Sequence, residues 1–138
     1  MLVTLLKMPT AKSGKIYVAL VDDDESLCRS LARLLRAAGI QAITYLSAEA
    51  FLSDTKQPQF DCLILDVQLL GMSGLQLQKQ LKSSGIAAPV IFITAYDDPQ
   101  AREQARSQGC VGFFRKTDSG SDVLEAIRRA VPEPSAPR

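Results

Sequence analysis

The sequence contains no histidine and no tryptophan, and it has only three cysteines. Cys28, Cys62 and Cys110 are widely spaced, stand in apolar surroundings and form no CxxC pair. Neither a disulfide framework nor a zinc site built from cysteine and histidine is therefore indicated. We expect three buried free thiols in a protein of the reducing cytoplasm.

An excess of charge of either sign is also missing. Lysine and arginine number 16 against 15 acidic residues, so the chain lacks the basic surplus of a protein that binds phosphate backbones, and we expect no direct contact with nucleic acid. The apolar start of the chain ends at Lys7, too early for a signal peptide, and we expect no membrane partner. With 46% hydrophobic residues and no low-complexity tract, the chain is expected to form one compact domain.

The two ends of the chain differ in composition from the part between them. Residues 1–14 form an expected N-terminal extension, within which Met8 is an alternative start. Residues 132–138 are rich in proline and small polar residues, a composition typical of an extended linker. The predicted domain occupies residues 15–131.

Apolar runs alternate with segments of helical periodicity throughout this domain. The runs predict strands over 16–21, 41–46, 61–67, 89–95 and 110–116, and the segments between and after them predict helices over 26–39, 47–53, 74–85, 97–109 and 121–131. Strands with little polar alternation, separated by helices, indicate a parallel sheet covered on both faces and joined by right-handed crossovers. The predicted fold class is doubly wound α/β.

Reactive side chains stand at the ends of four of the predicted strands. Asp22 and Asp23 follow the first strand, Asp66 lies at the end of the third, Thr94 at the end of the fourth and Lys116 at the end of the fifth. Each residue alone has an ordinary explanation as a helix cap, a strand former or a solvated charge. Ligands of this fold class bind outside the carboxyl ends of the strands, however, so four such ends together indicate a site.

The chemistry of these side chains suggests phosphoryl transfer. Three carboxylates at one sheet edge raise one another's pKa unless a cation neutralises them. Mg²⁺ prefers oxygen ligands and commonly binds carboxylates together with phosphate oxygens. A carboxylate such as Asp66 can attack phosphorus to form an aspartyl phosphate, while a metal on Asp22 and Asp23, the Lys116 ammonium and the Thr94 hydroxyl would each face one phosphoryl oxygen.

Four segments resemble, in order and spacing, the receiver domain of two-component response regulators, most closely its FixJ-like branch. They are "VDDDES" (21–26), "LILDVQLLGMSGLQL" (63–77), "PVIFITAY" (89–96) and "GFFRK" (112–116). The resemblance covers residues 15–131. It implies a five-stranded parallel sheet in the order 2-1-3-4-5, flanked by five helices, which is the flavodoxin-like or receiver fold.

The resemblance also implies individual roles, carried over position by position. It implies that Mg²⁺ is bound by Asp22, Asp23, Asp66 and the backbone carbonyl of Gln68. It implies that Asp66 is also the phosphoacceptor and that Lys116 binds the phosphate. Thr94 is the implied switch hydroxyl, and Phe113 is the implied switch aromatic. Asp24 receives no such role, and we expect it to cap the following helix.

The function that the resemblance implies is signalling rather than enzymatic. Such a domain takes a phosphoryl group from a histidine kinase and catalyses only its own phosphorylation and dephosphorylation. Phosphorylation changes the face formed by the expected helix over 97–109, the strand over 110–116 and the helix over 121–131. The proline-rich tail would lead to an output domain, often DNA-binding in this branch, and homodimer formation on phosphorylation stays open.

Three positions depart from the family pattern. Thr117 stands where a proline usually follows the lysine, Leu70 stands where a proline is common, and Asp118 replaces a frequent apolar residue. Because a cis bond before threonine costs about 2.5–4 kcal/mol, we expect a trans bond between Lys116 and Thr117. We also expect the polar loop over 116–121 to be mobile and little buried.

Two other functions fit part of the pattern. A haloacid-dehalogenase-type phosphatase would use Asp22 as nucleophile, with "VIFIT" and Lys116 as its later motifs. Such an enzyme needs a further acidic pair after the lysine and leaves Asp66 without a role. A degenerate receiver that serves only as a binding module is compatible with Thr117 and Leu70. The position of a phosphate label, on Asp66, on Asp22 or on neither, distinguishes the three functions.

Overall fold

Strands and helices alternate along residues 14–132, the part of the chain that the computed structural model describes. The strands are β1 (Tyr17–Val21), β2 (Gln41–Tyr45), β3 (Cys62–Asp66), β4 (Val90–Thr94) and β5 (Gly112–Arg115). The helices are α2 (Glu25–Ala37), α3 (Ala48–Ser53), α4 (Gly74–Ser83), α5 (Pro99–Ser107) and α6 (Gly120–Ala130). Most of the expected N-terminal extension and of the proline-rich tail lies outside the described residues.

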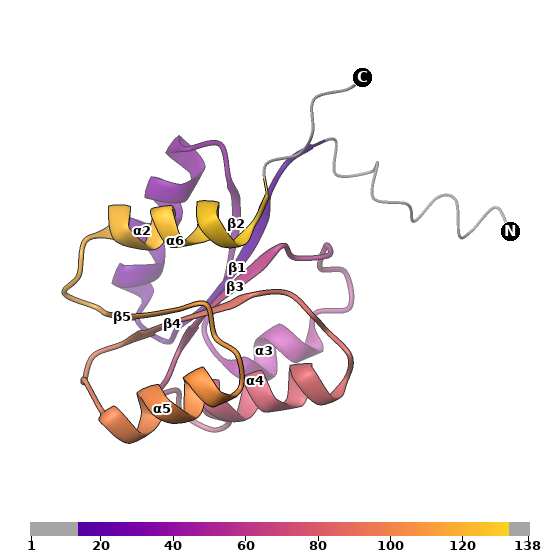
Figure 1. The fold of residues 1–138 in the computed structure, drawn as a ribbon. Helices are drawn as coiled ribbons and strands as arrows, with labels where there is room; N and C mark the ends of the chain where they lie inside the picture. Colours follow the sequence, from indigo (N-terminus) through magenta and orange to yellow (C-terminus); the bar gives the residue numbers. More distant parts are fainter. Residues whose placement is uncertain (1–13, 133–138) are drawn as a thin grey trace, which may run out of the picture.

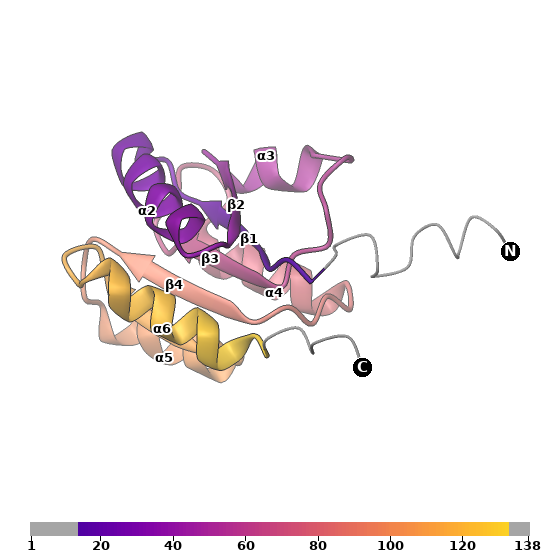
Figure 2. The same ribbon diagram turned by 90° about the horizontal axis from the view of Figure 1, so that it is seen from above.

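The strands form one parallel sheet in the order β2-β1-β3-β4-β5. Helices α2 and α6 cover one face of this sheet, and α3, α4 and α5 cover the other (Figures 1 and 2). The predicted doubly wound α/β class and the strand order 2-1-3-4-5 are therefore confirmed.

Two hydrophobic cores lie on the two faces of the sheet. The core under α3, α4 and α5 includes Phe51, Leu77, Phe92 and Ala105. The core under α2 and α6 includes Leu31, Leu35, Ile64 and Ile127. Both β3 and β4 are buried at every position, since each face of a central parallel strand packs against helices. Each strand therefore delivers its last side chain to the sheet edge from a rigid support.

Local signals set most element boundaries. Asp24 caps α2 through its side chain, as predicted, and the side chain of Ser47 caps α3. Gly39 and Gly85 follow the ends of α2 and α4 with φ of 85° and 80°, a conformation that glycine adopts without steric cost. The expected helices included one or two capping residues that are not themselves helical, whereas α2 and α6 begin one residue earlier than expected.

The three thiols are free, but only two of them are buried. Burial raises the pKa of Cys28 to about 11 and that of Cys62 to about 12, so both stay protonated at neutral pH. Cys110 is only partly buried, because it lies in the turn between α5 and β5. The expectation of three buried thiols is wrong for this residue.

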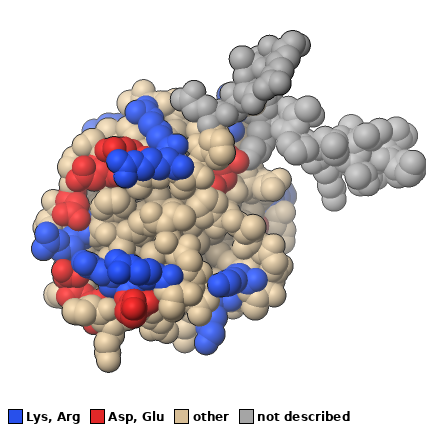
Figure 3. All heavy atoms as spheres, viewed as in Figure 1, with Lys and Arg blue, Asp and Glu red and all other residues tan. Residues whose placement is uncertain are grey.

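The surface agrees with the balanced charge of the sequence. On the face seen in Figure 3, basic and acidic side chains lie next to one another over both helical layers. Within residues 14–132, no helix has the length and apolar character needed to cross a membrane. The expected lack of nucleic-acid binding remains a prediction.

Candidate functional site

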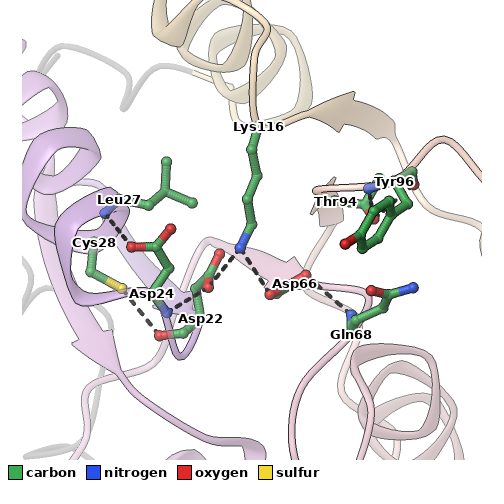
Figure 4. A network of polar contacts seen from close by, with 9 residues as sticks. All are labelled: Asp22, Asp24, Leu27, Cys28, Asp66, Gln68, Thr94, Tyr96 and Lys116. Atoms are coloured by element: carbon green, nitrogen blue, oxygen red, sulfur yellow. Dashed lines mark hydrogen bonds and ion pairs between the residues drawn. The ribbon is translucent and has the colours of Figure 1, made fainter.

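The parallel register brings four strand ends to one edge of the sheet. Val21 pairs with Leu65, Asp66 with Ile93, and Thr94 with Arg115. The side chains predicted at these ends therefore meet, and Figure 4 shows Asp22, Asp66 and Lys116 pointing toward one another.

The carboxylates of Asp22, Asp23 and Asp66 form an acidic cluster. One oxygen from each lies within 4.8 Å of the others. Asp22 and Asp66 are only 1% and 3% exposed, whereas Asp23 faces solvent. Two buried carboxylates this close repel each other strongly, so the cluster needs positive charge.

Lys116 supplies one positive charge between the two buried acids. Its Nζ lies 3.1 Å from Asp22 Oδ1 and 3.1 Å from Asp66 Oδ2. Burial by itself lowers the pKa of Lys116, but the hydrogen bonds to these two carboxylates outweigh burial and raise the pKa above its ordinary value. The backbone N–H of Lys116 donates to the carbonyl of Thr94 at 2.8 Å, which fixes the base of the side chain.

One lysine does not neutralise the cluster. Burial, and then the charge of Asp22, raise the pKa of Asp66 to about 6, against the opposing hydrogen bonds from the Gln68 N–H and Lys116. Asp22 Oδ2 is buried and accepts no hydrogen bond from any described residue. An unpaired buried carboxylate oxygen beside a second carboxylate fits an oxygen-seeking divalent cation.

Of the three consecutive aspartates after β1, Asp22 and Asp24 make different hydrogen bonds. Asp22 turns into the site, and its Oδ1 also accepts a hydrogen bond from the Asp24 N–H at 2.9 Å. Asp24 caps α2 by accepting from the Leu27 N–H at 3.1 Å. The Cys28 thiol donates to the backbone carbonyl of Asp22 at 3.3 Å (Figure 4). Helix α2 thus begins in a way that holds Asp22 in place.

The Thr94 hydroxyl is engaged within its own loop. Thr94 is 1% exposed, and its Oγ1 donates to the Tyr96 carbonyl at 2.9 Å and accepts from the Tyr96 N–H at 3.2 Å. Figure 4 shows Thr94 and Tyr96 to one side of the cluster formed by Asp22, Asp66 and Lys116.

Phe113 is partly buried on β5, where it pairs with Phe92 of β4. Its ring centroid lies 6.0 Å from that of Phe92, and the guanidinium carbon of Arg102 stands 5.4 Å from the centroid of the Phe113 ring. Arg102 pairs in turn with Asp97 at 2.5 Å. The sequence does not indicate a role for Arg102 or Asp97, because nothing in their spacing reveals a contact with an aromatic side chain of another element.

The loop after Lys116 forms a hydrogen-bonded turn. The described residues contain no cis peptide bond, so the bond between Lys116 and Thr117 is trans, as predicted. The Asp118 carboxylate accepts the Arg115 N–H at 2.8 Å, and the Asp118 N–H donates to the Arg115 carbonyl at 2.9 Å. Hydrogen bonds of Asp118 thus close the turn at the position where the family frequently has an apolar residue. The mobility of the loop remains a prediction.

A model of the response regulator receiver domain family matches residues 18–128. The chain belongs to this family. A receiver domain is a signalling domain of two-component systems, so the phosphatase alternative is set aside, and the acidic cluster is a pocket that could bind a metal.

Relatives and solved structures agree with this assignment. The chain is 37% identical to the response regulator protein TodT of Pseudomonas putida over 93% of its own length and 56% of that protein, and 40% identical to TmoT of Ectopseudomonas mendocina over 84% and 52%. The crystal structure of FixJ-N matches with a TM-score of 0.76 and 34% identity over 84% of this chain and 93% of that one. The receiver domain thus spans about half the length of the curated relatives.

Proposed function

We propose that this receiver domain accepts a phosphoryl group on Asp66 from the phosphohistidine of a histidine kinase. The observation that supports this role is the position of Asp66 at the buried end of β3, with its Oδ2 3.1 Å from Lys116 Nζ and its carboxylate in the acidic cluster. With a pKa of about 6, the carboxyl group is mainly ionised at neutral pH and is able to act as a nucleophile.

The proposed transfer exchanges one bond for another. An oxygen of Asp66 attacks phosphorus, the bond between phosphorus and the histidine nitrogen breaks, and the imidazole nitrogen keeps the electron pair. Lys116, already within 3.1 Å of Asp66, turns its ammonium group to a phosphoryl oxygen as negative charge arrives there. In a later step, water would attack phosphorus, the bond between phosphorus and the Asp66 oxygen would break, and inorganic phosphate would leave the free carboxylate behind.

Mg²⁺ is the proposed cofactor. Asp22, Asp23 and Asp66 would hold it together with the backbone carbonyl of Gln68, and the unpaired Asp22 Oδ2 supports this assignment. When bound, the ion would neutralise charge that the carboxylates and the phosphoryl oxygens share. Asp23 would be the solvent-exposed ligand of the ion.

Thr94 and Phe113 are the proposed switch. We propose that the Thr94 hydroxyl exchanges its hydrogen bonds with Tyr96 for one to the phosphoryl group. The movement of Thr94 leaves space into which the Phe113 ring turns inward. Residues of α5, β5 and α6 then present a changed surface to a partner.

The proposed partners follow from the relatives. Two of them bear the name transcriptional regulatory protein FixJ, and this chain covers 54% and 59% of their lengths. We therefore propose residues 15–131 as the receiver unit and residues 132–138 as a linker to an output domain that controls transcription, with dimerisation on phosphorylation as one way of control. A cytoplasmic location is part of the same proposal.

A labelling experiment tests the phosphoacceptor. The protein is incubated with Mg²⁺ and acetyl phosphate, trapped with borohydride and mapped by mass spectrometry. Label on Asp66 that disappears in Asp66→Asn is the expected result. Label on Asp22 would instead indicate phosphatase-type chemistry. Absence of label would favour the second candidate, a receiver that only binds partners, which the departures at Thr117 and Leu70 support.

A further inference from the structure

The loop between β3 and α4, residues 67–73, carries the proposed metal ligand Gln68 but has no proline to stiffen it. Leu70, at the position where the family commonly has proline, is 82% exposed. Gly71 has a φ of 76°, a conformation that glycine adopts without steric cost. The buried side chains of Val67 and Leu69 hold the first part of the loop, while Leu70 and Gly71 lie on the surface.

Glu49 reaches the exposed tip of this loop from a different element. Its Oε2 accepts a hydrogen bond from the Met72 N–H at 2.8 Å, across 23 residues of sequence. Glu49 lies in the first turn of α3, a helix whose start is fixed by the Ser47 cap and whose Phe51 is buried in the core. The carboxylate therefore extends from a rigid base.

Gly71 makes room for this contact. A Cβ placed on Gly71 would lie 2.7 Å from Glu49 Oε2, closer than real side chains allow. The hydrogen bond from Met72 lowers the pKa of Glu49, as does a second one from the backbone N–H of Glu49 itself. The carboxylate is thus ionised when it binds the loop, and the hydrogen bond is charge-assisted.

The base of the loop is coupled to the phosphoacceptor. The Gly74 N–H donates to the Val67 carbonyl at 3.1 Å, and the Gln68 N–H donates to Asp66 Oδ1 at 3.1 Å. Gly74 also lies against the backbone of Asp66, where a Cβ would come within 2.0 Å of the Asp66 carbonyl oxygen. These contacts join both ends of the loop to the strand end that carries Asp66.

We infer that Glu49 is a positioning residue of the phosphoacceptor site. Its carboxylate restrains the loop over 67–73, which lacks the proline that the family commonly has at the position of Leu70. Its hydrogen bond to Met72 restricts the backbone on the far side of Gly71, so that the Gln68 carbonyl and the Asp66 carboxylate keep their relative orientation. This inference rests on the proposed function of Asp66 and Gln68.

The test measures Mg²⁺ affinity and the rate of labelling by acetyl phosphate in Glu49→Ala, Glu49→Gln and wild type. We expect Glu49→Ala to weaken Mg²⁺ binding on the order of tenfold, the scale known for groups that orient metal ligands, and to slow labelling in parallel. Glu49→Gln keeps a neutral acceptor and should recover part of the loss. Glu125→Ala is the matched control, because Glu125 is an exposed glutamate of α6 that pairs with Arg129 on its own helix.

A purely structural role would give a different result. Glu49→Ala would then lower the melting temperature in Mg²⁺-free buffer without changing Mg²⁺ affinity, and this outcome overturns the inference, as does an equal loss in Glu125→Ala. If Glu49→Ala does not fold, Glu49→Gln decides, and wild-type Mg²⁺ affinity in that variant overturns the inference. Failure of wild type to label Asp66 concerns the proposed function instead, since weakened Mg²⁺ binding in Glu49→Ala would still support the anchoring of the loop.

Discussion

At the scale of single residues, Asp66 as the proposed phosphoacceptor would have to meet two opposing requirements. A buried position shields an aspartyl phosphate from water, but burial beside Asp22 makes the ionised carboxylate unfavourable. Lys116 offsets only part of this, because the pKa of Asp66 remains raised at about 6. The ionised Asp66 carboxylate is therefore stabilised when a cation binds beside it, and its charge is reduced when it accepts a phosphoryl group.

The variant Asp66→Asn should lose the phosphate label and become more stable without Mg²⁺. A folded-state pKa of about 6 lies above the unfolded value of about 4, so ionised Asp66 destabilises the fold fully above pH 6 and not at all below pH 4. Asparagine carries no charge and removes this effect. Thermal melting in Mg²⁺-free buffer should show a higher melting temperature for the variant at pH 7.5 and little difference near pH 4. A lower melting temperature at pH 7.5 would contradict the charge balance described for the site.

At the scale of elements, the helices that follow β3 and β5 begin with glycines in different surroundings. Gly74 opens α4 against the backbone carbonyl of Asp66, whereas Gly120 opens α6 against the Leu34 side chain, whose Cδ2 would lie 2.6 Å from an added Cβ. A backbone oxygen at the end of a central strand cannot move without disturbing the sheet, but a leucine side chain can change rotamer. The approach of α4 to the site therefore depends on Gly74.

Gly74→Ala should destabilise the protein by about 1–3 kcal/mol, the range for overpacking a buried site. Gly120→Ala, the matched change at the first residue of a helix, should cost clearly less. Urea unfolding of both variants measures the difference. Equal losses would mean that the close contact between Gly74 and Asp66 has no special role in the stability of the fold.

The link between β4 and β5 passes through α5. Tyr96 holds the Thr94 hydroxyl, Asp97 holds Arg102, and Arg102 stands over the ring of Phe113. These contacts run from the proposed switch hydroxyl to the proposed switch aromatic. A guanidinium over an aromatic ring contributes about 0.5–1 kcal/mol at an exposed site, small enough for phosphorylation to overcome.

Thr94→Val should leave labelling of Asp66 possible but remove the response of Phe113. Valine keeps the shape of threonine and lacks the hydroxyl that would bind the phosphoryl group. NMR of the Phe113 ring, with and without a bound phosphoryl mimic, should show a change in wild type and none in the variant. A response of equal size in both proteins would refute the coupling between the two residues.

At the scale of the whole molecule, the site joins four of the five strands, so a ligand bound there stabilises the entire sheet. The acidic cluster comes from the ends of β1 and β3. Lys116, which directly follows β5, binds two of these carboxylates through its side chain and Thr94 of β4 through its backbone N–H. A ligand that binds only the folded protein shifts unfolding by mass action, whichever residues it touches.

Mg²⁺ should therefore raise the melting temperature of wild type by several degrees, and Asp23→Asn should lose most of this shift. Asp23 is the exposed member of the cluster, so its replacement removes a ligand without leaving a cavity in the core. Glu125→Gln on α6 serves as the control for loss of an exposed acidic charge. An undiminished shift in Asp23→Asn would place the metal elsewhere.

The sequence by itself determined the alternation of strands and helices, the caps at Asp24 and Ser47, and the strand ends that carry the reactive groups. These features follow from local rules. Buried strands read as apolar runs, helices repeat apolar residues at three or four positions, and the carboxyl ends of parallel strands share one edge. The resemblance to receiver domains added the strand order and the proposed roles of Gln68 and Phe113.

The tertiary structure alone decided which atoms meet. Lys116 bridging Asp22 and Asp66, the unpaired Asp22 Oδ2, Arg102 over Phe113 and the bond from Met72 to Glu49 join residues from different elements. Periodicity states which face of a helix is apolar, but not how far the helix is shifted or turned against the sheet. Side-chain contacts of about 3 Å depend on that packing, so they arise only when all the elements are assembled.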